Sequence, residues 1–111
     1  MSRQILKMLN PSGPLAAETA HTLFLDIVGY TRLPLEAQSR LAGFLREVVR
    51  NTAEYRRALV HHALISLDLG DGMALVFFDD PLSPVKCAAE LMGATHAVDG
   101  LSLRMGIHSG P

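Results

Sequence analysis

The sequence has little cysteine, little charge and no charge bias, and each shortage excludes a class of protein. Cys87 is the only cysteine, so no disulfide can form within the chain, which fits a protein of the reducing cytoplasm. Charged residues make up 19% of the 111 residues, and the formal net charge is −1. Disordered chains combine low hydrophobicity with high net charge, and nucleic-acid or anionic-lipid binding needs clustered Lys and Arg. We therefore expect an ordered domain that binds neither nucleic acid nor a charged membrane surface.

Long hydrophobic runs are missing as well. No apolar segment approaches the roughly 20 residues that span a bilayer, and the apolar stretch after Met1 is too short for a signal peptide before it meets Pro11. Apolar residues still make up 49% of the chain, enough for the core of the one domain that this length allows. These features predict a cytoplasmic domain without a membrane segment.

The chain divides into a lead-in and a patterned domain. Residues 1–20 contain two prolines and a glycine and show no sustained hydrophobic period, so we interpret them as an N-terminal lead-in or linker. Residues 21–111 carry regular apolar patterns from end to end. We interpret this second segment as the domain.

Four strands are predicted in the domain. The apolar runs 22–28 and 101–107 have the length of buried strands. Two further runs, 63–69 and 73–78, flank the sequence Gly70-Asp71-Gly72. An Asp-Gly pair between apolar runs is typical of a β-hairpin, because the tight turn needs residues that tolerate positive φ.

Two amphipathic helices are predicted between these strands. The first follows Pro34 for about five turns, and its apolar face is formed by Leu41, Phe44, Leu45, Val48, Val49 and Thr52. The second begins at Ser83 and Pro84, which suit a cap and a first turn, and its apolar face is formed by Val85, Ala88, Ala89 and Met92. The order β-α-β-β-α-β predicts a ferredoxin-like α+β fold with a single sheet and helices on one face.

Two aspartates stand out as candidate cation ligands. Asp26 lies inside the first apolar run, where a carboxylate is costly unless it is paired or binds a cation; the alternative is a structural carboxylate satisfied by local amides. Asp71 lies in the hairpin, and its alternative role is that of a turn residue. In this strand order the first strand and the hairpin can be neighbours, so the two carboxylates can meet. Two carboxylates repel, and a hard divalent cation such as Mg²⁺ relieves the repulsion.

Two further features suit a phosphate ligand. The segment from Val28 through Gly29 and Tyr30 to Thr31 leaves a strand and approaches a helix. Its backbone amides can bind an anion, although a plain turn explains the same residues. Arg104 lies in the middle of the last strand, where it is either an edge-strand residue in solvent or a phosphate ligand.

Taken together, three segments resemble motifs of the class III adenylate/guanylate cyclase catalytic domain. Residues 24–31 (FLDIVGYT) are similar to the first-strand motif F-x-D-I-V-G-F-T, and residues 70–77 (GDGMALVF) are similar to the hairpin motif G-D-G-x-M-A-x-F with one residue fewer. Residues 103–111 (LRMGIHSGP) are similar to the strand motif R-x-G-I-H-x-G-P. The resemblance covers about residues 21–111 and implies the N-terminal half of such a domain, without its C-terminal half.

The resemblance implies a function and a set of site residues. A lyase of this family converts ATP or GTP into a 3′,5′-cyclic nucleotide and pyrophosphate for intracellular signalling, because the ribose 3′-oxygen attacks the α-phosphate. Asp26 and Asp71 would bind two metal ions, Mg²⁺ or Mn²⁺, with the carbonyl of Ile27 as a further ligand. The residues implied to bind the phosphates are Val28, Gly29, Tyr30, Thr31 and Arg104. Active sites of the family form at a dimer interface, so a homodimer is expected.

The sequence departs from the family pattern at one position of the site. Leu67 stands where the family has an adenine-selecting lysine, four residues before the second metal aspartate, so the choice between ATP and GTP stays open. The family's transition-state asparagine and arginine belong to the second half, beyond Pro111. We therefore expect an active enzyme in the intact parent and an inactive fragment in residues 1–111. The alternative function is a non-catalytic cyclase-like signalling module that binds nucleotide or a partner protein.

Overall fold

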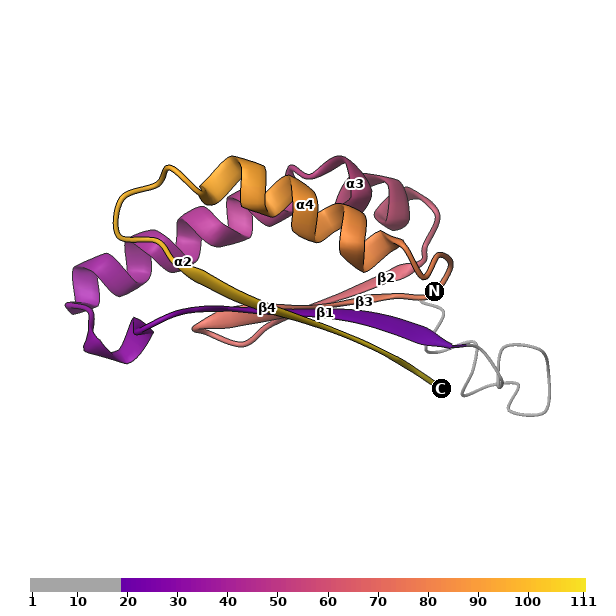
Figure 1. The fold of residues 1–111 in the computed structure, drawn as a ribbon, viewed down its shortest axis with the longest axis horizontal. Coiled ribbons are helices and arrows are strands. Elements are labelled where there is room, and N and C mark those ends of the chain that lie inside the picture. The colour runs from indigo at the N-terminus through magenta and orange to yellow at the C-terminus, as the bar shows by residue number, and fades with distance from the viewer. Residues whose placement is uncertain (1–18) are drawn as a thin grey trace.

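The computed structural model describes residues 19–111, and these form a mixed α+β domain with one antiparallel sheet of four strands. Within these residues, three α-helices lie on one face of the sheet and none lies on the other, which we call the bare face (Figure 1). The predicted lead-in, residues 1–20, lies almost wholly outside the described residues. The elements in chain order are β1 Ala20–Ile27, the 3₁₀ helix η2 Tyr30–Arg32, α2 Leu35–Arg50, α3 Ala53–Val60, β2 Leu64–Asp68, β3 Gly72–Phe77, α4 Ser83–Thr95 and β4 Leu103–Gly110.

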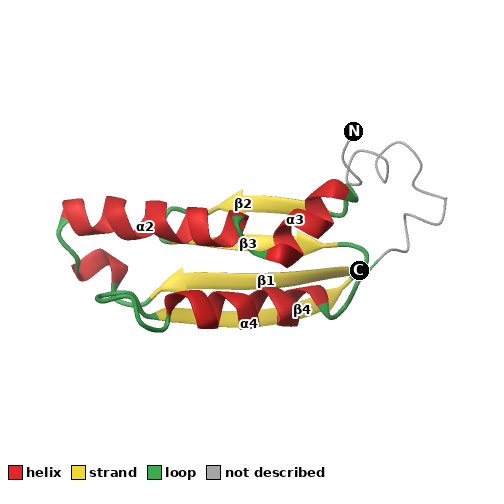
Figure 2. Cartoon of the chain, turned by 90° about the horizontal axis from the view of Figure 1, so that it is seen from above, coloured by secondary structure: helices red, strands yellow, loops and turns green. Residues whose placement is uncertain are grey.

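Strand β1 lies at the centre of the sheet, whose order is β2-β3-β1-β4, and it pairs antiparallel with both β3 and β4. Its side chains alternate between two faces, as strand geometry requires. Leu23, Leu25 and Ile27 are buried beneath the helices, whereas Phe24 is half exposed on the bare face. Seen from above, α4 runs over β1 and β4, and α2 runs along the side of β2 and β3 (Figure 2).

The first predicted helix is in fact two helices. Helix α2 ends at Arg50, and Thr52 adopts an extended conformation and caps α3, its hydroxyl accepting a hydrogen bond of 3.2 Å from the Tyr55 N–H. The Glu90 carboxylate of α4 also accepts hydrogen bonds from the first amides of α3. A threonine is a favoured N-cap, so Thr52 begins a new helix although it continues the apolar period of the helix before it.

The predicted apolar face of the second helix is wrong. In α4, Val85 and Met92 are more than half exposed, and the buried face is formed by Ser83, Pro84, Cys87, Leu91 and Thr95. Most residues of this face other than Leu91 are small or weakly apolar, so apolar periodicity selected a neighbouring side of the helix. Of the predicted residues, Ala88 is partly buried against the core. Cys87 is fully buried in the core, and burial raises the pKa of its thiol to about 11. Ser83 does not cap the helix, because it is already the first helical residue and its hydroxyl donates to Glu54 at 2.6 Å.

A charged network holds α3 against the start of α4. Arg57 donates to Glu54 at 2.7 Å, to Asp79 at 2.8 Å and to Ser83 at 2.9 Å. Burial opposes ionisation of Glu54, but hydrogen bonds from Arg57 and Ser83 outweigh it, so the pKa of Glu54 is lowered. The hydrogen bond from Arg57 likewise lowers the pKa of Asp79. Because every charge in the network has a partner, the buried Glu54 carboxylate is tolerated.

The hairpin between β2 and β3 depends on two glycines in different ways. The Leu69 N–H donates to the Gly72 carbonyl at 2.9 Å, which closes a two-residue turn of Gly70 and Asp71. The positive φ of 87° falls on Gly70, the first turn residue, as in type II′ turns. Gly72 instead provides room, because a Cβ there would collide with the Leu25 carbonyl oxygen and lie 2.7 Å from the Asp26 Cα.

Replacing Gly72 by Ala should therefore destabilise the fold. We expect the free energy of unfolding to fall by about 2–3 kcal/mol, the cost of forcing a group into a filled position bounded by backbone. Urea denaturation measures the change. The matched control is Gly93→Ala in α4, where a Cβ meets nothing within 4 Å and helix propensity should add about 0.5–1 kcal/mol. Equal stability of the two variants would contradict the close approach at Gly72.

Candidate functional site

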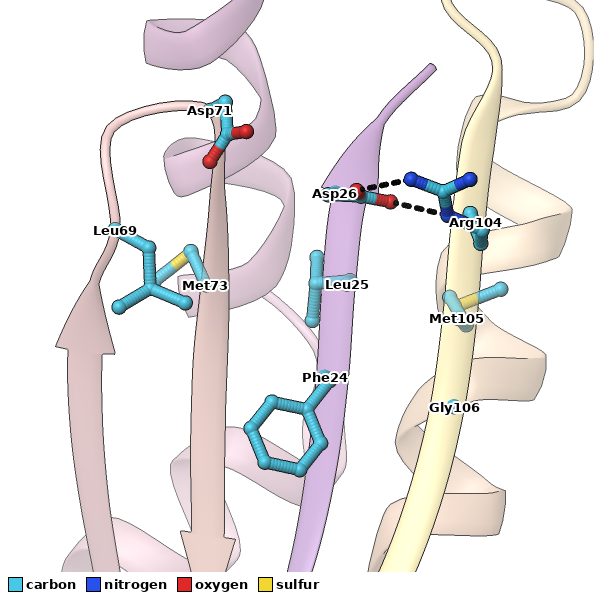
Figure 3. A pocket seen from close by; sticks show the side chains of 9 residues that line it. All are labelled: Phe24, Leu25, Asp26, Leu69, Asp71, Met73, Arg104, Met105 and Gly106. Carbon is cyan, nitrogen blue, oxygen red and sulfur yellow. Dashed lines mark hydrogen bonds and ion pairs between the residues drawn. The ribbon is translucent and has the colours of Figure 1, made fainter.

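The end of β1 and the hairpin turn lie side by side, as the sequence predicted for the two aspartates. Asp26 is paired with Gly72 in the sheet register, and the Ile27 N–H donates to the Asp71 carbonyl at 2.9 Å. Asp26 and Asp71 therefore stand at one end of the sheet on neighbouring strands (Figure 3). Within residues 19–111 the Asp71 carboxylate forms no hydrogen bond or ion pair, and it is free to accept a ligand.

Asp26 is an ion-paired residue of the bare face. The Arg104 guanidinium donates from Nε to Oδ1 at 3.2 Å and from Nη2 to Oδ2 at 2.8 Å, so both carboxylate oxygens are engaged (Figure 3). The side chain of Asp26 is 33% exposed and that of Arg104 is 74% exposed. The hydrogen bond and the charge of Asp26 raise the pKa of Arg104, and the charge of Asp71 adds to the effect. Arg104 is thus both an edge-strand residue and part of the aspartate site.

The segment after β1 forms the third side of the site. Gly29 has a φ of 71° and introduces the 3₁₀ turn η2, in which the Arg32 N–H donates to the Gly29 carbonyl at 3.0 Å. The Val28 N–H already donates to the Ser102 carbonyl at 2.8 Å. Val28 is therefore not available as an amide donor to a phosphate, and this role is left to Gly29, Tyr30 and Thr31.

All of the predicted site residues line one polar hollow of about 350 Å³. They come from the end of β1, the η2 turn, the hairpin and β4, which are far apart in the sequence. Arg32 also lines the hollow, and sequence reasoning missed it. Its position beside the glycine-containing turn was the available signal, since a basic side chain there suits an anion site.

A second, more apolar hollow of about 460 Å³ adjoins the first on the bare face (Figure 3). The two hollows share Asp26, Asp71 and Arg104. The remaining lining residues of the second hollow are Phe24, Leu25, Leu69, Met73, Met105 and Gly106. Sequence reasoning assigned no role to this apolar group, although the two-residue strand period puts Phe24 on the face of Asp26. The combined shape suits a ligand with an anionic part and a flat apolar part.

The donor set fits a hard divalent cation. Asp26 and Asp71 supply carboxylate oxygens, and Mg²⁺ is commonly held by one or two carboxylates together with waters and substrate phosphates. Within the described part of the chain, no group of three or more His, Cys, Asp or Glu side chains gathers to form a complete protein cage. A cation at this site would therefore depend on the ligand's phosphates for part of its coordination.

Comparison with protein-family models finds none that matches this chain, and comparison with curated proteins finds no significant match. Among the helices of residues 19–111, none has the length and apolar character needed to cross a membrane.

The left-handed conformation of Gly29 allows a test of the backbone turn that follows β1. A Cβ at Gly29 meets nothing within 4 Å, so Gly29→Ala adds only backbone strain at a φ of 71°. We expect the variant to lose about 1 kcal/mol of stability, the usual cost of this conformation for an L-residue. Gly29→Asn is the control, because Asn tolerates the left-handed region better. Urea denaturation in which both variants match the wild type would show that the turn relaxes freely.

Proposed function

We propose that residues 21–111 form the N-terminal half of a class III nucleotidyl cyclase catalytic domain, which in the intact protein converts ATP or GTP into a 3′,5′-cyclic nucleotide and pyrophosphate. One observation carries the proposal. Three separate segments that resemble the family's motifs contribute Asp26, Asp71 and Arg104 to a single polar hollow beside a glycine turn. Asp26 and Asp71 are 45 positions apart in sequence, and Asp71 and Arg104 are 33 apart. A shared ligand site accounts for their meeting at one hollow.

The sheet supports the proposed fold. The order β2-β3-β1-β4, with β1 antiparallel to both neighbours, is the order that a ferredoxin-like β-α-β-β-α-β chain adopts when helices make both crossovers. Helix α3 is then an addition to the first crossover, between α2 and β2. The helices on one face leave the other face bare for a ligand and for the partner subunit of the proposed homodimer (Figure 1).

In the proposed site each residue has a defined task. Asp26, Asp71 and the Ile27 carbonyl would hold Mg²⁺ or Mn²⁺, which when bound polarises the phosphates and favours ionisation of the ribose 3′-hydroxyl. The amides of the turn bind the terminal phosphates, and Arg104 binds a phosphate with its fork of donors. The 3′-hydroxyl loses its proton to solvent, a bond forms between the 3′-oxygen and the α-phosphorus, and the bond from that phosphorus to pyrophosphate breaks. Orientation and charge neutralisation supply most of the catalysis in such reactions.

The apolar hollow is suited to the base of the nucleotide. Of its nine lining residues, only Asp26, Asp71 and Arg104 are charged, and these face the polar hollow as well. Phe24, which is 49% exposed, and Leu69, which is 55% exposed, offer apolar surface that does not select a hydrogen-bonding pattern. The side chains of Leu25 and Met73 are buried in the core. This arrangement accepts either purine, in agreement with Leu67 in place of the family's lysine.

The decisive experiment is an activity assay of the intact parent domain with Mg²⁺ or Mn²⁺ and either nucleotide. Asp26→Asn and Asp71→Asn keep the side-chain shape but remove a charge from the metal site, so turnover should fall by roughly 10²-fold or more. Asp68→Asn is the matched control, since Asp68 lines neither hollow and the asparagine Oδ1 can still accept the hydrogen bond from the Gly70 N–H. Circular dichroism of each variant verifies the fold.

Two results of this assay would reject the proposed cyclase activity. A folded wild-type parent that is inert towards both nucleotides, or Asn variants with full activity, would favour the non-catalytic binding module, to which the missing lysine at Leu67 already lends support. The two alternatives share the site but not the chemistry, so nucleotide binding without turnover identifies the module.

Base selection is tested separately at Leu67. This residue is 49% exposed on β2 and pairs with Ala74. Leu67→Lys adds a hydrogen-bond donor beside the apolar hollow and should raise the preference for ATP over GTP about fivefold, the value of one net hydrogen bond of about 1 kcal/mol. Ile65→Lys, two residues away on the same face, should leave the ratio unchanged. An equal effect of both lysines on the ratio of kcat/KM values would mean that the base lies elsewhere.

A further inference from the structure

The ion pair between Asp26 and Arg104 conflicts with the tasks proposed for these residues. Both oxygens of Asp26 accept hydrogen bonds from Arg104, at 3.2 and 2.8 Å, yet the same carboxylate is the proposed ligand of a divalent cation. The guanidinium is the proposed ligand of a phosphate. A cation at Asp26 would lie beside a positive charge, which repels it. The pair must therefore open before either residue can perform its task.

We propose that Arg104 is an exchangeable counter-ion of Asp26, which excludes free divalent cations from the site and moves to the polyphosphate when a metal–nucleotide complex binds. This inference rests on the proposed function and describes how that site is regulated. Arg104 is a positioning residue in this scheme, because it controls access to Asp26. Metal and nucleotide then enter together, and a cation without its nucleotide binds weakly.

The surroundings of Arg104 allow the exchange. Its side chain is 74% exposed on the edge strand β4, and Asp26 is its single hydrogen-bonding partner within residues 19–111. The next residue on the same face of β4 is Gly106, where a Cβ would meet nothing within 4 Å. Arg104 lines both hollows, so a modest rotation of its side chain keeps the guanidinium within the site.

The other well-paired arginine shows what a fixed ion pair looks like in this protein. Arg57 is 35% exposed and donates to Glu54, Asp79 and Ser83 together. Releasing it would leave the buried Glu54 carboxylate without its main partner, which is strongly destabilising. Releasing Arg104 leaves Asp26, which is one third exposed, accessible to solvent or a ligand. The first pair is structural, and the second is free to exchange.

The charge balance of the polar hollow agrees with the exclusion of free divalent cations. Its charged lining residues are two carboxylates, Asp26 and Asp71, and two guanidiniums, Arg32 and Arg104. These formal charges cancel, so the hollow has little net attraction for a free divalent ion. Polyphosphate oxygens neutralise the guanidiniums, and the carboxylates are then left for the cation.

The test measures two affinities of the 111-residue chain: that for Mn²⁺ alone, by electron paramagnetic resonance of the unbound ion, and that for Mg²⁺-tripolyphosphate, by calorimetry. Arg104→Gln should bind Mn²⁺ roughly fivefold more tightly, as expected when a unit charge is removed about 5 Å from a divalent ion in water. The same variant should bind Mg²⁺-tripolyphosphate more weakly. Opposite signs of the two changes are the signature of exchange, and a purely structural role would weaken both.

Two controls separate the ion pair from the general charge of the hollow. Arg32→Gln removes the same charge from the same hollow but leaves the pair intact, so it should raise Mn²⁺ affinity less than Arg104→Gln does. Arg104→Lys keeps the charge with a single donor group and should lie between the wild type and Arg104→Gln. Thermal melts establish that each variant is folded.

The outcomes distinguish this inference from the proposed function. Equal Mn²⁺ affinity in the wild type and Arg104→Gln, an equal gain in Arg32→Gln, or weaker binding of both probes by Arg104→Gln would overturn the exchange while leaving the metal site in place. Absence of Mn²⁺ binding in every variant and the wild type, at concentrations that saturate a two-carboxylate site, would overturn the metal site and the exchange with it.

Discussion

The backbone contact between β1 and β3 at Gly72 sets the geometry of this end of the molecule. Because residue 72 has no side chain, the hairpin backbone lies against Leu25 and Asp26, and the Ile27 amide reaches the Asp71 carbonyl. Main-chain bonds rather than flexible side chains therefore hold the turn beside the end of β1. The positions of both aspartates, and the hollow between the hairpin and the η2 turn, follow from this contact.

The two ends of β3 use charge in different ways. Beyond its C-terminal end, Asp79 joins a network in which Arg57 has three side-chain partners and Glu54 is buried. At its N-terminal end, Asp71 carries a carboxylate without a partner within the described residues. A satisfied network fixes the packing of helices, whereas an unsatisfied exposed carboxylate is ready to accept a ligand. The fold thus keeps its structural and its ligand-accessible charges apart.

Much of this arrangement was predictable from the sequence, and the exceptions have physical causes. The strands, the hairpin and the nearness of β1 to the hairpin turn follow from apolar runs and the Asp-Gly signal. The break before α3 was missed because Thr52 fits the apolar period and is also a good cap. The buried face of α4 was missed because Pro84, Cys87 and Thr95 carry little hydrophobic signal. The Asp26–Arg104 pair depends on a register between strands 78 residues apart, which no local pattern encodes.

The two faces of strand β1 are under different constraints. Leu23, Leu25 and Ile27 face the core, while Phe24 and Asp26 face the hollows of the proposed site. Alternate positions can therefore drift under different pressures: packing volume constrains one set, and ligand chemistry constrains the other. A substitution can change the core packing and leave the site face nearly intact, or the reverse. A single inserted or deleted residue changes both. Because the side-chain period is two, it would turn every later side chain to the opposite face, exchanging core and site along the strand in one step.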